Sequence, residues 1–130
     1  MTNETDDTAC GNVLVIEGDA EYGRILSALL SGIGYEVRLA TRREMASAAL
    51  EQEIYDFIIL DPSVYGKWTG QFLWTLAGSG STMAAVIVIS ASTNIEEQAR
   101  QLGAGRWLTK PVSPSDVLRA MTHISRLTAT

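Results

Sequence analysis

The sequence predicts an α/β protein with an open, doubly wound sheet of five parallel strands, a (βα)5 arrangement. Five short apolar runs rich in Val, Ile and Leu are each followed by a segment whose apolar residues recur at helical spacing. The 130 residues suit one compact domain. Strands that alternate with helices pair in parallel through right-handed crossovers, so a sheet covered on both faces is expected.

The first two strands are expected to differ in burial. The first strand is predicted at residues 12–16, where an unbroken apolar run follows Asn12 and is typical of a strand buried on both faces. An acidic turn at 17–19 ends this strand, and helical spacing then predicts a helix through 22–33. Residues 35–40 alternate between polar and apolar side chains, so the second strand is expected at an edge of the sheet.

The second helix is predicted to begin after Thr41, with Glu44 three residues on as in a capping box. Its buried stripe is expected at closely spaced apolar residues: Met45, Ala48, Ala49 and Leu50. The third strand is predicted at residues 55–60 and ends at Asp61.

The second half of the chain continues the alternation. The predicted elements are a helix at 68–76, a strand at 84–89 ending at Ser90, a helix at 94–102, a short strand at 107–108 and a final helix. Ser113 is predicted to cap the final helix, with Pro114 at its first position and Asp116 at the capping-box position. Side chains expected in the core are Phe72, Leu73, Leu76, Val117, Leu118, Met121 and Ile124.

Composition excludes several classes of function. Residues 1–11 are polar and predicted to be a disordered arm, with the folded domain at 12–130. No signal peptide or membrane span is evident, and Cys10 is the only cysteine, so a cytoplasmic protein without an intrachain disulfide is expected. The net charge of -5 disfavours direct nucleic-acid binding. No glycine-rich phosphate loop follows the first strand and His123 is the only histidine, so neither a nucleotide-cofactor enzyme nor a transition-metal site is expected.

Residues able to do chemistry follow four of the predicted strands. They are the turn at 17–19, Asp61, Ser90 and Lys110. The carboxyl ends of parallel strands meet at one edge of a doubly wound sheet, where ligands bind. Transfer of a phosphoryl group to a carboxylate brings two anions together, and a divalent metal and a lysine ammonium would reduce their repulsion. A hydroxyl at the same edge could bind the new phosphate.

Four segments of the chain resemble the receiver domain of response regulators, from about residue 12 to the C-terminus. They are Glu-Gly-Asp at 17–19, Tyr-Asp-Phe-Ile-Ile-Leu-Asp at 55–61, Ile-Val-Ile-Ser-Ala at 87–91 and Gly-Ala-Gly-Arg-Trp-Leu-Thr-Lys-Pro at 103–111. The resemblance implies the flavodoxin-like receiver fold. It also implies that Asp61 is the phospho-acceptor, Ser90 the switch hydroxyl, Lys110 the phosphate-contacting base and Trp107 the switch aromatic residue. The implied Mg2+ ligands are Glu17, Asp61 and the backbone carbonyl of Ser63, and the Lys110–Pro111 bond is usually cis in this family.

The chain departs from the family pattern at three positions. Gly18 stands where the family has a second acid that ligates the metal, and Asp19 falls outside the usual ligand set. Mg2+ binding is therefore expected to be weakened or lost unless Gly18 is compensated, since Mg2+ demands near-octahedral geometry. Tyr65 replaces a loop proline, and Trp107 is larger than the common tyrosine or phenylalanine.

Two functions of different classes follow. The first is a two-component receiver, not an enzyme, that takes a phosphoryl group from a histidine kinase or phosphotransfer protein on Asp61. Phosphorylation would switch the face formed by the fourth helix, fifth strand and fifth helix, which would bind a downstream protein or form a homodimer. The alternative, motivated by Gly18, is a phosphorylation-independent pseudo-receiver that acts as a protein-binding module.

Overall fold

The computed structural model describes residues 10–128, and its elements alternate as the sequence predicts. The strands are β1 (Gly11–Ile16), β2 (Tyr35–Ala40), β3 (Phe57–Leu60), β4 (Ala85–Ser90) and β5 (Arg106–Thr109). The helices are α2 (Ala20–Ile33), α3 (Arg43–Gln52), α4 (Thr69–Ala77), α5 (Ile95–Gln101) and α6 (Pro114–Thr128), with short 3-10 turns η1 (Pro62–Val64) and η2 (Gly66–Trp68).

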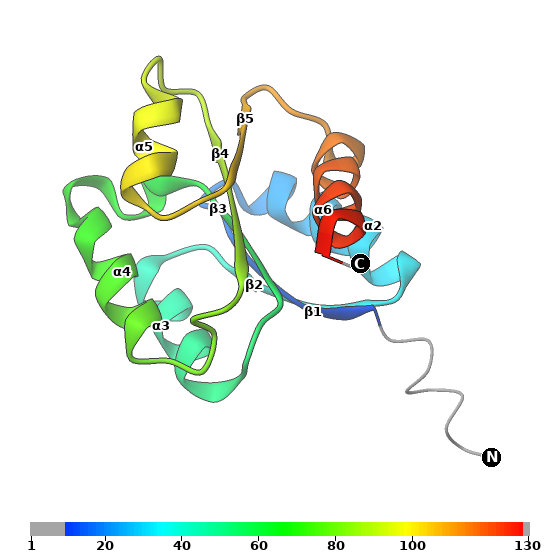
Figure 1. Cartoon of the computed structure of the whole chain (residues 1–130), viewed down its shortest axis with the longest axis horizontal. Helices are drawn as coiled ribbons and strands as arrows, with labels where there is room; N and C mark the ends of the chain where they lie inside the picture. The colour runs from blue at the N-terminus through cyan, green and yellow to red at the C-terminus, as the bar shows by residue number, and fades with distance from the viewer. Residues whose placement is uncertain (1–9, 129–130) are drawn as a thin grey trace.

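The five strands form one parallel sheet in the order β2-β1-β3-β4-β5. Helices α2 and α6 cover one face of the sheet, and α3, α4 and α5 cover the other (Figure 1). This is the doubly wound, flavodoxin-like arrangement that was predicted, and the polar second strand does lie at an edge. No helix within residues 10–128 is long and apolar enough to span a membrane.

Alternating side chains of the central strands supply two hydrophobic layers, one on each face of the sheet. Leu14 and Ile16 of β1 pack with the α3–α5 layer, whereas Val13 and Val15 pack with α2 and α6. All four side chains have no exposed surface, which explains why β1 reads as an unbroken apolar run.

The start of the domain differs by one residue from the prediction. β1 begins at Gly11, which pairs with Tyr35, and the Cys10 N–H donates to the Gly34 carbonyl at 3.0 Å. Residues 1–9 of the predicted arm lie outside the described residues.

The predicted capping box of the second helix is wrong. The N-cap of α3 is Arg42, whose side chain makes no capping hydrogen bond, and the Thr41 hydroxyl donates to the Met45 sulfur at 3.4 Å. Met45 is 36% exposed, and the buried residues are Ala46, Ala49 and Leu50. The helix therefore starts two residues after Thr41. Ala49 and Leu50 are buried as predicted, whereas Ala46 takes the buried place that was predicted for Met45.

The predicted N-cap of the last helix is confirmed for the hydrogen bond that the Ser113 hydroxyl accepts. The Ser113 hydroxyl accepts the Asp116 N–H at 3.1 Å, immediately before Pro114 begins α6. Val117 and Met121 are fully buried, and Leu118 and Ile124 are partly buried. On α4, Phe72 is buried as predicted, but its neighbour Leu73 is 39% exposed, because successive helical residues point about 100° apart and of the two only Phe72 faces the sheet.

Candidate functional site

Strand register brings three of the predicted site residues together at the carboxyl edge of the sheet. Ile16 is paired with Leu60 across β1 and β3, so Glu17 and Asp61 leave the sheet at the same level. Lys110 follows β5, and its N–H donates to the Ser90 carbonyl at 2.8 Å. The Lys110–Pro111 peptide bond is cis, as the resemblance implied.

The ammonium of Lys110 joins the two carboxylates. Its Nζ donates to Glu17 Oε1 at 2.7 Å and to Asp61 Oδ2 at 2.5 Å. Glu17 is 2% exposed and Asp61 6% exposed, so both are acids that need a partner. The three groups together carry one net negative charge when all are ionised.

Two opposing effects act on Lys110. Burial alone would lower the pKa of the ammonium, but the hydrogen bonds and negative charges of Asp61 and Glu17 outweigh it and raise the pKa above its ordinary value. The ammonium also lies 5.6 Å from the centre of the Tyr22 ring, within the range of a cation–π contact. Tyr22 is itself fixed by its hydroxyl, which donates to the Val112 carbonyl at 2.8 Å.

The other carboxylate oxygens accept backbone N–H groups. Asp61 Oδ1 accepts the Ser63 N–H at 2.9 Å, which caps the η1 turn. Glu17 Oε2 accepts the Asp19 N–H at 2.9 Å. Each of the four oxygens therefore has one donor, which fixes both side chains in orientation.

Asp19 is engaged elsewhere, as expected for a residue outside the ligand set. Its Oδ1 accepts the N–H groups of Glu21 and Tyr22, both at 3.1 Å, and so caps the N-terminus of α2. A carboxylate is favourable at this end of a helix. Asp19 therefore does not replace the acid missing at Gly18.

The donor set does not fit a tightly held divalent cation. Glu17 and Asp61 supply two carboxylates, both paired with Lys110, and Gly18 supplies no third. Among residues 10–128, no group of three or more His, Cys, Asp or Glu side chains is placed to hold a metal ion. Position 18 has room for a side chain: a Cβ there would lie 3.7 Å from Val64 Cγ2 and 4.0 Å from the Thr41 carbonyl oxygen.

Ser90 is buried, and its hydroxyl is hydrogen-bonded to a residue that the sequence did not single out. Its hydroxyl donates to Gln98 Oε1 at 3.0 Å and accepts the Ser92 N–H at 3.0 Å. Gln98 lies on the inner side of α5, between the buried Ile95 and Ala99. A polar residue within that apolar stripe was the available signal, since buried polar side chains need partners.

Trp107 lies on β5, one of the two edge strands of the sheet, and is 39% exposed. Its role as a switch residue remains a prediction.

Tyr65 occupies the loop after Asp61 as a buried core residue. It is 2% exposed and packs edge-to-face on Phe72, with ring centres 5.9 Å apart. Burial raises its pKa to about 12, with the charge of Arg43 acting in the opposite direction. Its hydroxyl has no hydrogen-bond partner in the described part of the chain.

A Tyr65→Phe substitution is expected to raise the free energy of unfolding by about 1 kcal/mol, because it removes a buried hydroxyl without breaking a hydrogen bond. Urea denaturation would measure the change. Tyr55→Phe is the matched control, since the Tyr55 hydroxyl donates to Glu53 at 3.2 Å, and this variant should gain no stability. An equal loss of stability in both variants would contradict the expectation.

The chain was compared with known proteins. A model of the response regulator receiver domain matches residues 13–122. The probable transcriptional regulator ycf27 of Porphyridium aerugineum is 29% identical over 119 residues, which cover 88% of this chain and 48% of that protein. The alginate biosynthesis regulatory protein AlgB of Pseudomonas aeruginosa is 25% identical, over 97% of this chain and 29% of that protein. The chain thus spans less than half the length of these two relatives.

Solved structures show the same fold. A response regulator of Burkholderia pseudomallei, described with a phosphorylated aspartic acid, a calcium ion and citrate, superposes with a TM-score of 0.73 at 26% identity, covering 91% of this chain and 71% of that chain. The chemotaxis protein CheY4 of Vibrio cholerae gives a TM-score of 0.77 at 23% identity, over 88% of this chain and 98% of that chain.

Proposed function

The chain belongs to the response regulator receiver family, and we propose that it accepts a phosphoryl group on Asp61 from a histidine kinase or phosphotransfer protein. The observation that carries the proposal is the buried Asp61 carboxylate, held by the Lys110 ammonium and the Ser63 N–H at the carboxyl edge of the sheet. The chain would act as a switch rather than as an enzyme.

The transfer requires few protein groups beyond these. A carboxylate oxygen of Asp61 bonds to phosphorus while the phosphorus–nitrogen bond of the donor phosphohistidine breaks. The departing imidazole nitrogen keeps the bonding electron pair and takes a proton from solvent. Lys110 is already within hydrogen-bond distance of Asp61, so it can donate to the phosphoryl oxygens as negative charge accumulates there.

Charge balance supports a site with little dependence on a metal. Glu17, Asp61 and Lys110 sum to one negative charge, whereas an acid at position 18 would make it two. The smaller negative charge reduces the repulsion that an incoming phosphoryl group meets. We expect Mg2+ to bind weakly at most, through Glu17, Asp61 and the Ser63 carbonyl.

The response to phosphorylation would involve Ser90. Its hydroxyl can bind the new phosphate only by leaving Gln98, which would release α5 from β4 at that point. A phosphate that binds the rearranged state better shifts the population toward it. The face formed by α5, β5 and α6, which includes Trp107, would then change its affinity for a downstream protein or a second copy of the chain.

The paired carboxylates favour a second candidate, a pseudo-receiver that binds a partner without phosphorylation. All four carboxylate oxygens have donors before any ligand arrives, and Gly18 withholds one metal ligand. In a pseudo-receiver these ion pairs would stabilise the folded domain and take no part in phosphoryl transfer.

Treatment with acetyl phosphate, followed by intact-mass measurement, separates the two candidates. A receiver should gain the mass of one phosphoryl group, and Asp61→Asn should abolish that gain. Asp56→Asn is the matched control, since Asp56 is an exposed acid whose Oδ2 accepts the Asn12 N–H. Incorporation that persists in Asp61→Asn would refute the assignment. No incorporation in the wild-type protein, with or without Mg2+ and with beryllofluoride causing no amide shifts near Asp61, would favour the pseudo-receiver.

A further inference from the structure

A pocket lies at the opposite end of the strands from Asp61, where β4 and β5 begin. It has a volume of about 290 Å³. Its lining consists mostly of small or apolar residues, with two basic side chains: Ala84, Ala85, Val86, Gly103, Gly105, Arg106, His123 and Ile124. Side chains of this size leave the hollow open between β4, β5 and α6.

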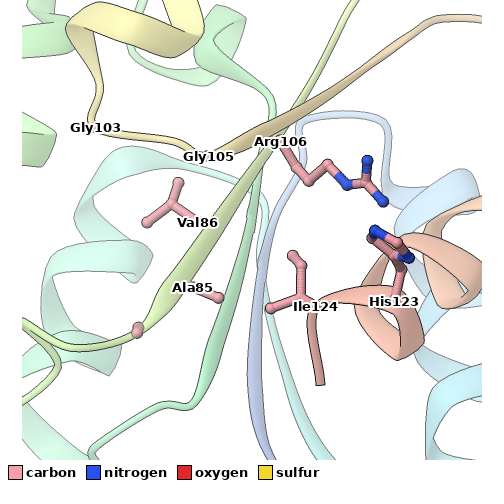
Figure 2. Close-up of a pocket in the computed structure, with 8 residues that line it drawn as sticks. Ala85, Val86, Gly103, Gly105, Arg106, His123 and Ile124 are labelled. Atoms are coloured by element: carbon pink, nitrogen blue, oxygen red, sulfur yellow. The ribbon is translucent and has the colours of Figure 1, made fainter. Parts of the chain in front are cut away.

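The two basic side chains lie next to each other at one side of this pocket. Figure 2 shows the guanidinium of Arg106, from β5, beside the imidazole of His123, from α6, with Ala85 and Ile124 on the apolar side. None of the described residues that line the pocket carries a carboxylate. Within residues 10–128, neither basic side chain is among the ion pairs or side-chain hydrogen bonds of the structure.

The acid of the adjoining pocket already has partners. An adjoining pocket shares Arg106 and His123 and also includes Asp116 and Arg119. Arg119 donates to Asp116 at 2.7 Å, and the Ser113 hydroxyl and Arg119 hold the pKa of that carboxyl below its ordinary value. Asp116 therefore has its own partners and is not needed to neutralise Arg106.

We propose that this pocket binds a small organic carboxylate, whose oxygens contact Arg106 and His123 and whose apolar part lies against Ala85 and Ile124. The planar guanidinium presents paired N–H groups that match a carboxylate, and a histidine ring offers at least one N–H donor in either protonation state. The pocket thus gathers two basic side chains on a chain whose net charge is -5. The site is independent of phosphorylation at Asp61.

The proposal is tested by amide NMR titration of the full chain with butyrate as the probe. Saturable shifts are expected at Ala85, Gly105, Arg106 and His123. Butyramide, which has the same size and no charge, should leave these signals unchanged. Equal shifts with butyramide, or no localised shifts with butyrate, would overturn the proposal.

Substitutions identify the residues responsible. Arg106→Gln should weaken butyrate binding about tenfold, as expected for loss of a charge-assisted hydrogen bond. His123→Gln should weaken it less, because glutamine keeps a donor. The control is Arg42→Gln, which makes the same charge change at the exposed start of α3, on the other face of the sheet. Equal weakening by Arg42→Gln would indicate general charge attraction and refute a site at Arg106. If Arg106→Gln does not fold, Arg106→Lys, which keeps the charge but loses the planar fork, should bind less tightly than the wild type.

Discussion

Lys110→Met is expected to lower the free energy of unfolding by about 3 kcal/mol, because it leaves two buried carboxylates without their cation. That loss is a large fraction of the stability of an ordinary domain. The methionine fills a similar volume, so the change isolates the charge. Urea denaturation at neutral pH would measure it, with a circular dichroism spectrum to confirm the fold.

A second substitution provides the internal control. Adding Glu17→Gln to Lys110→Met removes one of the unpaired charges and should recover part of the lost stability. Glu17→Gln alone leaves the ammonium paired with Asp61 and should cost less than Lys110→Met. If Lys110→Met is as stable as the wild-type protein, the two ion pairs do not contribute to folding as described.

The wild-type protein should also show the contribution of Lys110 in its pH dependence. The pKa of Lys110 is higher in the folded protein than its ordinary value of about 10.5. A group whose pKa rises on folding stabilises the folded state fully below its unfolded pKa and loses that effect as the pH passes its folded pKa. Stability should therefore fall above about pH 10.5, and Lys110→Met should lack this part of the decline.

Gly18→Asp is expected to tighten Mg2+ binding at least about tenfold, since it adds a third carboxylate beside Glu17 and Asp61. The backbone at this position imposes no left-handed conformation, and the nearest atoms to a new Cβ are at ordinary contact distance. Calorimetric titration with MgCl2 would measure the affinity of both proteins.

Gly32→Asp is the matched control for this change. It adds the same charge on the exposed side of α2, where a new Cβ meets no atom within 4 Å. Its Mg2+ affinity should equal that of the wild-type protein. If Gly18→Asp also leaves the affinity unchanged, the weak metal site cannot be attributed to the missing side chain at position 18.

Sequence patterns predicted the sheet well, because its central strands are buried on both faces and read as continuous apolar runs. Residues 35–40 alternate between polar and apolar side chains because part of this strand is exposed, and their edge position followed from that alternation. The start of α3 was missed because Thr41 and Glu44 match the sequence pattern of a capping box, whereas the backbone becomes helical only at Arg43. A local pattern cannot show where tertiary packing places the first turn.

The candidate site was predictable in part. The strand ends placed Glu17, Asp61 and Lys110 at one edge, and the structure brings their charged atoms into contact. The bond between Ser90 and Gln98 was not predicted, because it depends on how α5 is rotated against β4. Such rotation is decided by packing, and a short helix carries too few apolar residues to reveal it.

The contact between Lys110 and Glu17 joins residues 93 positions apart, and the contact between Lys110 and Asp61 joins residues 49 apart. Contacts this distant in the chain close large loops, so their entropic cost is met only when most of the sheet has assembled. The cluster therefore exists only while β5 is docked on β4. Local opening of the C-terminal quarter would separate Lys110 from Glu17 and Asp61 even if β1, β2 and β3 stayed folded. The ability of Asp61 to accept a phosphoryl group therefore depends on the docking of the last strand.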